Sequence, residues 1–277
     1  MDHKESHFPG VGGLDLYTQS WRPEGKPLGV LAIVHGFGEH SGRYQNVVQY
    51  FAPRNYALYA YDLRGHGRSP GQRGYIGGWS DYREDTRAFL GFVREREPGL
   101  PLFLYGHSLG GLIVLDYGLH YTDGLKGVIA TGPVLGPPQI PAILLHLSKL
   151  LSRAWPTLSM NSGLDASEIS RDPDVVRAYV QDPLVHSKGT PRLGAETLRT
   201  TTWAQEHAGE WRLPVLIVHG GDDRIAPPGF SREFFEKLTL ADKERLEVPG
   251  GFHEPHNDLD KAAVFADVER WLQRHLR

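Results

Sequence analysis

The segment Gly106-His107-Ser108-Leu109-Gly110-Gly111 decides the fold, because it joins a short apolar run to a helical pattern. The run at residues 101–105 predicts a buried strand, and residues 109–121 predict a helix. Glycines two residues before and after Ser108 are typical of a sharp strand-to-helix turn, in which larger side chains would clash. Such a turn presents the Ser108 hydroxyl above the sheet at a helix N-terminus, which predicts a nucleophile. The alternative is a glycine-rich turn in which the serine has no chemical role.

Predicted strands and helices alternate through most of the chain. We expect strands at residues 28–34, 57–61, 101–105, 127–131, 214–218 and 245–248, and helices at 80–97, 109–121 and 261–276. This order predicts an α/β fold with a mostly parallel central sheet and helices on both faces. Residues 135–206 break the alternation with prolines, helical patterns and no convincing strand. We therefore expect a core formed by residues 1–134 and 207–277, with residues 135–206 inserted as a helical lid.

Composition excludes several classes of protein. The chain has 277 residues, of which 40% are hydrophobic and 23% charged, and its net charge is −3. These values are typical of a globular protein and lack the basic excess of a nucleic-acid binder, so we expect no nucleic-acid partner. No cysteine is present, which excludes disulfides and thiolate chemistry. No apolar run suits a signal peptide or a membrane span, so we expect a cytoplasmic protein.

A nucleophilic serine needs a base, and the base needs a carboxylate to orient it. The loops after the last two predicted strands supply both, and they meet the serine because the carboxyl ends of parallel strands share one edge. We expect His253 as the base, since Gly250 and Gly251 allow a tight loop that presents it. His256 is the alternative base. Asp222 and Asp223 both follow a predicted strand, and the spacing alone leaves the choice between them open.

Ester or amide cleavage also needs donors for the developing oxyanion. Backbone N–H groups supply them in this arrangement: one from Leu109, directly after the serine, and one from the loop that follows an early strand. The segment His35-Gly36-Phe37-Gly38 follows the predicted strand at residues 28–34, which makes the Phe37 amide the second expected donor. We expect His35 to hold this loop in place.

Together these motifs resemble the monoacylglycerol lipase and lysophospholipase branch of the α/β-hydrolases. The resemblance extends over nearly the whole chain and rests on these segments: His35-Gly36-Phe37-Gly38-Glu39-His40-Ser41-Gly42-Arg43-Tyr44, Asp62-Leu63-Arg64-Gly65-His66-Gly67-Arg68-Ser69, the serine turn, Asp182-Pro183-Leu184, His219-Gly220 with Asp223, and His253-Glu254. The lid is the least similar region.

The resemblance assigns roles that the spacing leaves open. It implies Asp223 as the acid of a Ser108-Asp223-His253 triad. It also implies a pocket for the alcohol part of the substrate at four residues with polar groups, namely Glu39, Arg43, Tyr179 and His256. Simpler interpretations remain: an ion pair within one loop for the first two, and packing of the lid for the tyrosine.

The lid contains one strongly amphipathic stretch, at residues 141–155. One side of the predicted helix is apolar, whereas His146, Lys149 and Arg153 share the other. The apolar side consists of Ile143, Leu144, Leu147, Leu150, Leu151 and Trp155. The apolar side either covers an acyl pocket or makes transient contact with a lipid surface. Both interpretations favour a small lipid ester as the substrate.

The sequence thus predicts a serine hydrolase of lipid esters, most specifically of monoacylglycerol, that needs no metal or cofactor. Lysophospholipase, broad carboxylesterase and aminopeptidase activities are the alternatives, because related folds host them all. A non-catalytic binding protein on the same scaffold is a further alternative, which the complete set of triad residues disfavours. The sequence predicts no oligomeric state.

Overall fold

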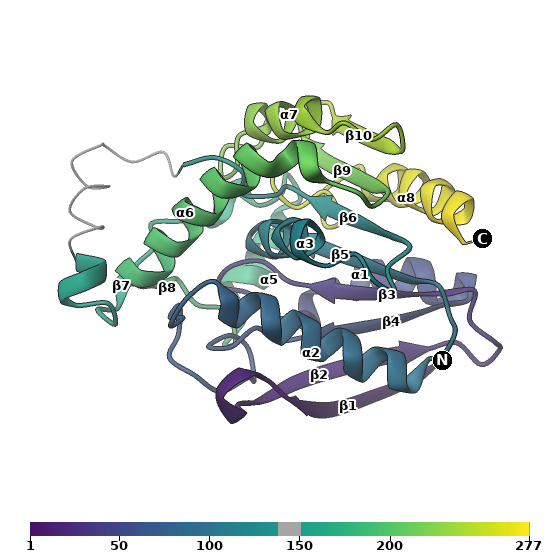
Figure 1. Cartoon of the computed structure of the whole chain (residues 1–277), viewed down its shortest axis with the longest axis horizontal. Helices are drawn as coiled ribbons and strands as arrows, with labels where there is room; N and C mark the ends of the chain where they lie inside the picture. Colours follow the sequence, from purple (N-terminus) through teal and green to yellow (C-terminus); the bar gives the residue numbers. More distant parts are fainter. Residues whose placement is uncertain (138–150, 277) are drawn as a thin grey trace.

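A computed structural model describes residues 1–137 and 151–276 of the chain (Figure 1). Most of the amphipathic stretch predicted at residues 141–155 therefore lies outside the described residues. Within the described ranges, no helix is both long and apolar enough to cross a membrane.

The centre of the molecule is an eight-stranded sheet in the order β1-β2-β4-β3-β5-β6-β9-β10. The strands β3 to β10 of this sheet pair in parallel, whereas the first two strands join it antiparallel. Their bounds are β1 Asp2–Pro9, β2 Asp15–Arg22, β3 Gly29–Val34, β4 Tyr56–Tyr61, β5 Leu102–His107, β6 Gly127–Thr131, β9 Val215–Gly220 and β10 Lys243–Val248. The predicted mostly parallel sheet is confirmed.

Helices cover both faces of this sheet (Figure 1). Those that the structure describes are α1 Gln45–Phe51, α2 Ser80–Arg96, α3 Leu109–His120, α5 Pro173–Gln181, α6 Pro191–His207, α7 Pro228–Lys237 and α8 Lys261–His275. The three helices that the sequence predicted individually are α2, α3 and α8, and each ends within one residue of its predicted bound.

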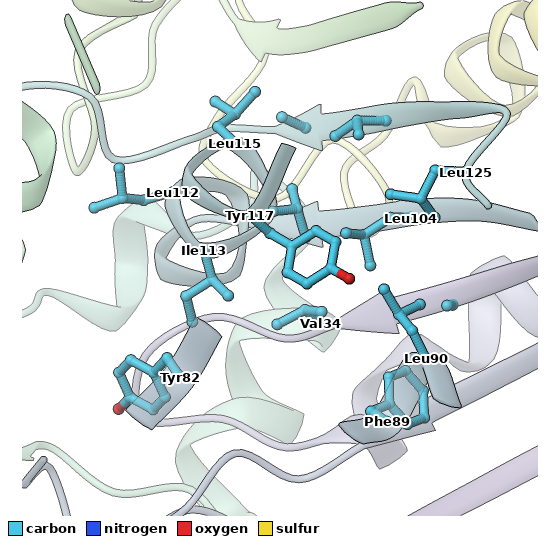
Figure 2. Packing of buried hydrophobic residues seen from close by; sticks show 14 of the residues in the cluster. Val34, Tyr82, Phe89, Leu90, Leu104, Leu112, Ile113, Leu115, Tyr117 and Leu125 are labelled. Atoms are coloured by element: carbon cyan, nitrogen blue, oxygen red, sulfur yellow. The ribbon is translucent and has the colours of Figure 1, made fainter. Parts of the chain in front are cut away.

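The alternation of side chains along β3 divides the core into two layers. Val30, Ala32 and Val34 pack with α2 and α3, whereas Leu31 and Ile33 face the opposite way and pack with α1 and α8. Figure 2 shows the first layer, where Ile113 of α3 lies toward Tyr82 of α2. Residues 109–118 are all buried, so α3 is held on every side and the serine at its N-terminus has a rigid support.

Three features were not predicted. The hairpin β1–β2 was missed, because β1 is an edge strand whose mostly exposed, polar side chains give no apolar run. The short helices α1 and α7 were missed as well. Between β6 and β9 the described chain is mainly helical, but Met160–Asn161 (β7) and Lys188–Gly189 (β8) pair antiparallel, which corrects the expectation of no strand there.

Candidate active site

The turn between β5 and α3 is strained at the serine. Ser108 has φ 56° and ψ −115°, and among the described residues only it and Asn55 have positive φ without being glycine. The expected need for glycine on both sides is confirmed. A Cβ at Gly106 would lie 2.3 Å from the Gly110 carbonyl oxygen, and one at Gly110 would lie 2.2 Å from that of Val34. Such strain persists only where the surroundings enforce it, as they do at functional sites.

The loop after β10 brings a histidine to this serine. His253 Nε2 lies 2.9 Å from Ser108 Oγ, and His253 Nδ1 lies 2.7 Å from Asp223 Oδ2. All three residues are buried. The structure thus brings together three side chains that are far apart in sequence, in the relay geometry that activates a hydroxyl as a nucleophile.

The loop after β9 distinguishes the two candidate acids. Asp222 is exposed, whereas Asp223 points inward and its Oδ1 accepts hydrogen bonds from the amides of Ile225 and Ala226, at 2.9 and 2.8 Å. His219 adds a contact that sequence reasoning missed, with Nε2 at 3.1 Å from Asp223 Oδ2. These contacts leave the carboxylate one orientation, toward His253.

Asp223 and His253 each stabilise the charged form of the other. Burial alone would lower the pKa of His253, but the charge and hydrogen bond of the Asp223 carboxylate outweigh it and raise that pKa above the ordinary value. Burial alone would raise the pKa of Asp223. The charge of His253 and the hydrogen bonds of His219 and His253 hold that pKa well below its usual range. Asp223 therefore stays ionised and is suited to stabilise an imidazolium.

The backbone amides of Phe37 and Leu109, which the sequence predicts as oxyanion donors, have no hydrogen-bond partner among the described residues. The turn that contains Phe37 is fixed from below by Glu39, whose Oε1 accepts the Gly36 amide at 2.6 Å. His35 holds the same loop, as expected: its Nε2 accepts the Leu63 amide at 2.8 Å.

A buried ion network lies beside this turn. Arg43 Nη1 donates to Glu39 Oε2 at 2.8 Å, and the guanidinium makes two hydrogen bonds to Glu254, at 2.7 and 2.8 Å. The Tyr44 hydroxyl donates to Glu39 at 2.9 Å, and the Tyr179 ring lies 4.5 Å from the guanidinium carbon. Sequence reasoning missed the role of Glu254, because nothing in its spacing distinguishes it from a neighbour of His253.

His256 lies apart from the serine. It is fully buried, stacks on Tyr44 with ring centroids 4.9 Å apart, and meets the ring of His107 edge-on at 4.7 Å. Neither ring nitrogen has a partner among the described residues, and burial lowers the pKa of His256 to about 4. The hydrogen-bond partner of the serine hydroxyl is His253 Nε2, so the alternative base does not occupy that position.

An apolar cavity of about 520 Å³ has Phe37 and Leu109 among its lining residues. None of the four residues implied for the alcohol pocket lines it. The other lining residues come mainly from the loop after β6, from α6 and from the loop before α7, including Val134, Leu135, Leu193, Thr197, Leu198 and Ile225. In the described part of the chain, no group of three histidine or acidic side chains is placed to hold a metal ion.

Residues 25–260 match the family described as serine aminopeptidase, S33. The chain belongs to this family. A monoacylglycerol lipase of Mycolicibacterium smegmatis is 35% identical over 98% of both chains. A caffeoylshikimate esterase of Arabidopsis thaliana is 30% identical over 99% of this chain and 86% of its own. The crystal structure of Paleococcus ferrophilus monoacylglycerol lipase superimposes with a TM-score of 0.85 at 36% identity, over 94% of this chain and 99% of that one. The predicted α/β-hydrolase fold and the resemblance to monoacylglycerol lipases are confirmed.

Proposed function

We propose that the protein is a serine ester hydrolase that cleaves monoacylglycerol into glycerol and a fatty acid. The observation that carries the proposal is the apolar cavity whose lining includes Phe37 and Leu109, the residue that directly follows Ser108. An acyl chain in this cavity places its ester carbonyl at the nucleophile. The full-length similarity to two monoacylglycerol lipases supports the same substrate class.

In the proposed mechanism, Ser108 attacks the ester carbonyl while His253 Nε2 takes its proton. Asp223 holds the imidazole in the required tautomer and stabilises its cation. The amides of Phe37 and Leu109 stabilise the tetrahedral oxyanion, each by about 3–4 kcal/mol. His253 then protonates the departing glycerol, and a water molecule hydrolyses the acyl-serine with the same groups in reversed roles.

We propose that the alcohol part of the substrate is bound on the opposite side of the serine from the cavity, at Glu39, Arg43, Tyr179 and His256. Arg43 has little free capacity there, because two carboxylates already accept its hydrogen bonds. The Tyr179 hydroxyl and the His256 ring nitrogens have no such partners among the described residues. The half-buried Tyr179 is suited to bind a hydroxyl group directly, whereas the ring nitrogens of the fully buried His256 are closed off from solvent.

We propose that residues 135–206 act as the lid over the acyl chain and make transient contact with lipid surfaces. Large apolar side chains of its described part are exposed to solvent: Trp155 is 59%, Met160 42% and Val180 67% exposed. Such side chains are suited to enter the headgroup region of a bilayer or micelle, where the substrate is dissolved.

The family description names an aminopeptidase, which needs an acidic group for the substrate ammonium. The acidic residues of the lid do not line the cavity. Asp165 and Asp172 accept hydrogen bonds at the starts of short helices, Glu168 pairs with Arg224, and Asp174 pairs with its neighbour Arg177. An apolar cavity without a carboxylate favours an acyl chain.

The test is a comparison of turnover on monoacylglycerols of increasing chain length, a lysophospholipid and an aminoacyl amide. Ser108→Ala provides the blank. We expect hydrolysis of the monoacylglycerols with a preference for one range of chain lengths, and none of the amide. Faster turnover of the amide or of the lysophospholipid than of every monoacylglycerol overturns the proposed substrate.

A further inference from the structure

The turn that contains Phe37 is also held from the side of residues 135–206. The segment between α5 and β8 crosses it, and the His186 amide donates to the Gly38 carbonyl at 2.8 Å. The approach is close enough to require glycine: Gly38 has φ +75°, and a Cβ there would lie 2.4 Å from the His186 carbonyl oxygen. The backbone of one oxyanion donor is therefore in direct contact with the lid.

The Phe37 ring packs against two histidines that also contact each other. It meets His66 of the core edge-on at 5.9 Å and His186 of the lid edge-on at 5.7 Å between ring centroids. The two histidine rings lie 4.8 Å apart and complete the cluster. Aromatic pairs in this geometry contribute about 0.5–1.5 kcal/mol each beyond the area they bury.

This cluster packs as neutral rings at neutral pH. Burial and neighbouring positive groups hold the pKa of His66 well below its ordinary value and lower that of His186 to about 4. The charged and titratable groups that face the pair are Arg73, His35 and Lys188. The His186 Nδ1 atom accepts the Lys188 amide at 3.2 Å, and the His66 Nδ1 atom lies 3.0 Å from the Arg64 carbonyl oxygen, whereas both Nε2 atoms are buried without a partner among the described residues. The contact of both rings with Phe37 is therefore one of shape and ring packing.

We propose that His186 is a positioning residue for the oxyanion hole: from the lid, it fixes the Phe37 turn so that the Phe37 amide stays aimed at the developing negative charge. The proposal rests on the proposed function only in requiring that Ser108 forms an oxyanion with an ester. Its consequence is that the lid does more than cover the acyl chain. Its contact with the Phe37 turn also holds one member of the proposed donor set in place.

The test is His186→Ala, assayed on a short soluble ester, p-nitrophenyl acetate, and on a long-chain monoacylglycerol. Complete loss of an oxyanion donor lowers kcat by about 100–1,000-fold, so a loosened donor is expected to cost about tenfold. We expect this loss in kcat with little change in KM, and the same loss on both substrates, because every ester forms the same oxyanion.

His186→Phe keeps an aromatic edge against Phe37 and is expected to recover most of the lost kcat. His186→Leu fills the space without a ring, and it is expected to behave like the alanine variant. If His186→Ala does not fold, the comparison of the phenylalanine and leucine variants still tests the proposal. The matched control is His207→Ala: this partly buried histidine lies at the far end of α6, about 24 Å along the helix from Pro191, and should leave both activities unchanged.

Two results overturn the proposal. One is an unchanged kcat in both the alanine and the leucine variants. The other is a loss that appears in KM and grows with acyl length, since this would mean that His186 only shapes the cover of the acyl pocket. A failure of the proposed function has a different sign: the wild-type protein hydrolyses p-nitrophenyl acetate but no monoacylglycerol. In that case the His186 variants are still compared by their kcat on p-nitrophenyl acetate.

Discussion

Arg43→Met offers a quantitative test of the ion network beside the active site. The side chains of Arg43, Glu39 and Glu254 are each less than 10% exposed, and the arginine is the only cation bonded to the two carboxylates among the described residues. Methionine fills much of the volume but leaves two buried negative charges without their partner. Breaking a buried pair in this way costs about 3–5 kcal/mol. For a chain of this size we expect Tm to fall on the order of 10 °C.

The pH dependence of this loss identifies its cause. In the wild type, burial would raise the pKa of Glu254, but Arg43 outweighs it and holds that pKa below its ordinary value. The wild type therefore gains stability above the unfolded-state pKa and loses it as pH falls through the folded-state value. Without Arg43 burial dominates and the pKa of Glu254 is raised, so the variant loses stability as pH increases. We expect the free energy of unfolding of Arg43→Met to fall further below that of the wild type at pH 8 than at pH 5.5.

The assay is thermal or urea unfolding of both proteins at the two pH values. The matched control is Arg224→Met, which removes an arginine that is 73% exposed and paired with Glu168 at 3.3 Å. That change is expected to cost no more than about 0.5–1 kcal/mol at either pH. A deficit in Arg43→Met equal to the control, or one that does not depend on pH, refutes the reasoning.

Three further predictions concern activity. Asp223→Asn should lower kcat by about 10⁴-fold, whereas the exposed Asp222→Asn should stay near wild type in the same ester assay; equal losses contradict the assignment of the acid. The raised pKa of His253 means that kcat/KM should increase with pH through an inflection above about 6.5, and a profile that is flat from pH 5 to 8 argues against a histidine base. Thr197→Phe, which narrows the apolar cavity, should slow long-chain monoacylglycerols by about tenfold relative to short esters, whereas the exposed Thr202→Phe on the same helix should not; no change in chain-length preference would place the acyl chain elsewhere.

The core was predictable because its signals are local. A glycine on each side of Ser108, apolar runs for the buried parallel strands and a glycine-rich loop before His253 each follow from backbone sterics or burial over a few residues. The spacing alone left Asp222 and Asp223 open, since the direction in which each side chain points depends on amides that lie after them, at Ile225 and Ala226.

The contacts that sequence reasoning missed join distant segments. Glu254 meets Arg43 across 211 residues, and nothing near either one in sequence indicates the pair. His186 reaches the Phe37 turn only because the chain between β6 and β9 folds back over the core. The hairpin β1–β2 was missed for a different reason: an exposed edge strand such as Asp2–Pro9 buries too little to show an apolar pattern.

The central claim is that Ser108 is the activated nucleophile of the Ser108-His253-Asp223 relay. The most direct measurement is the mass of the intact protein after reaction with a fluorophosphonate, followed by mapping of the modified peptide. We predict a single adduct on Ser108 in the wild type and a large decrease in its rate of formation in His253→Ala. An adduct on another residue, or a folded wild-type protein that remains unlabelled, would contradict the claim.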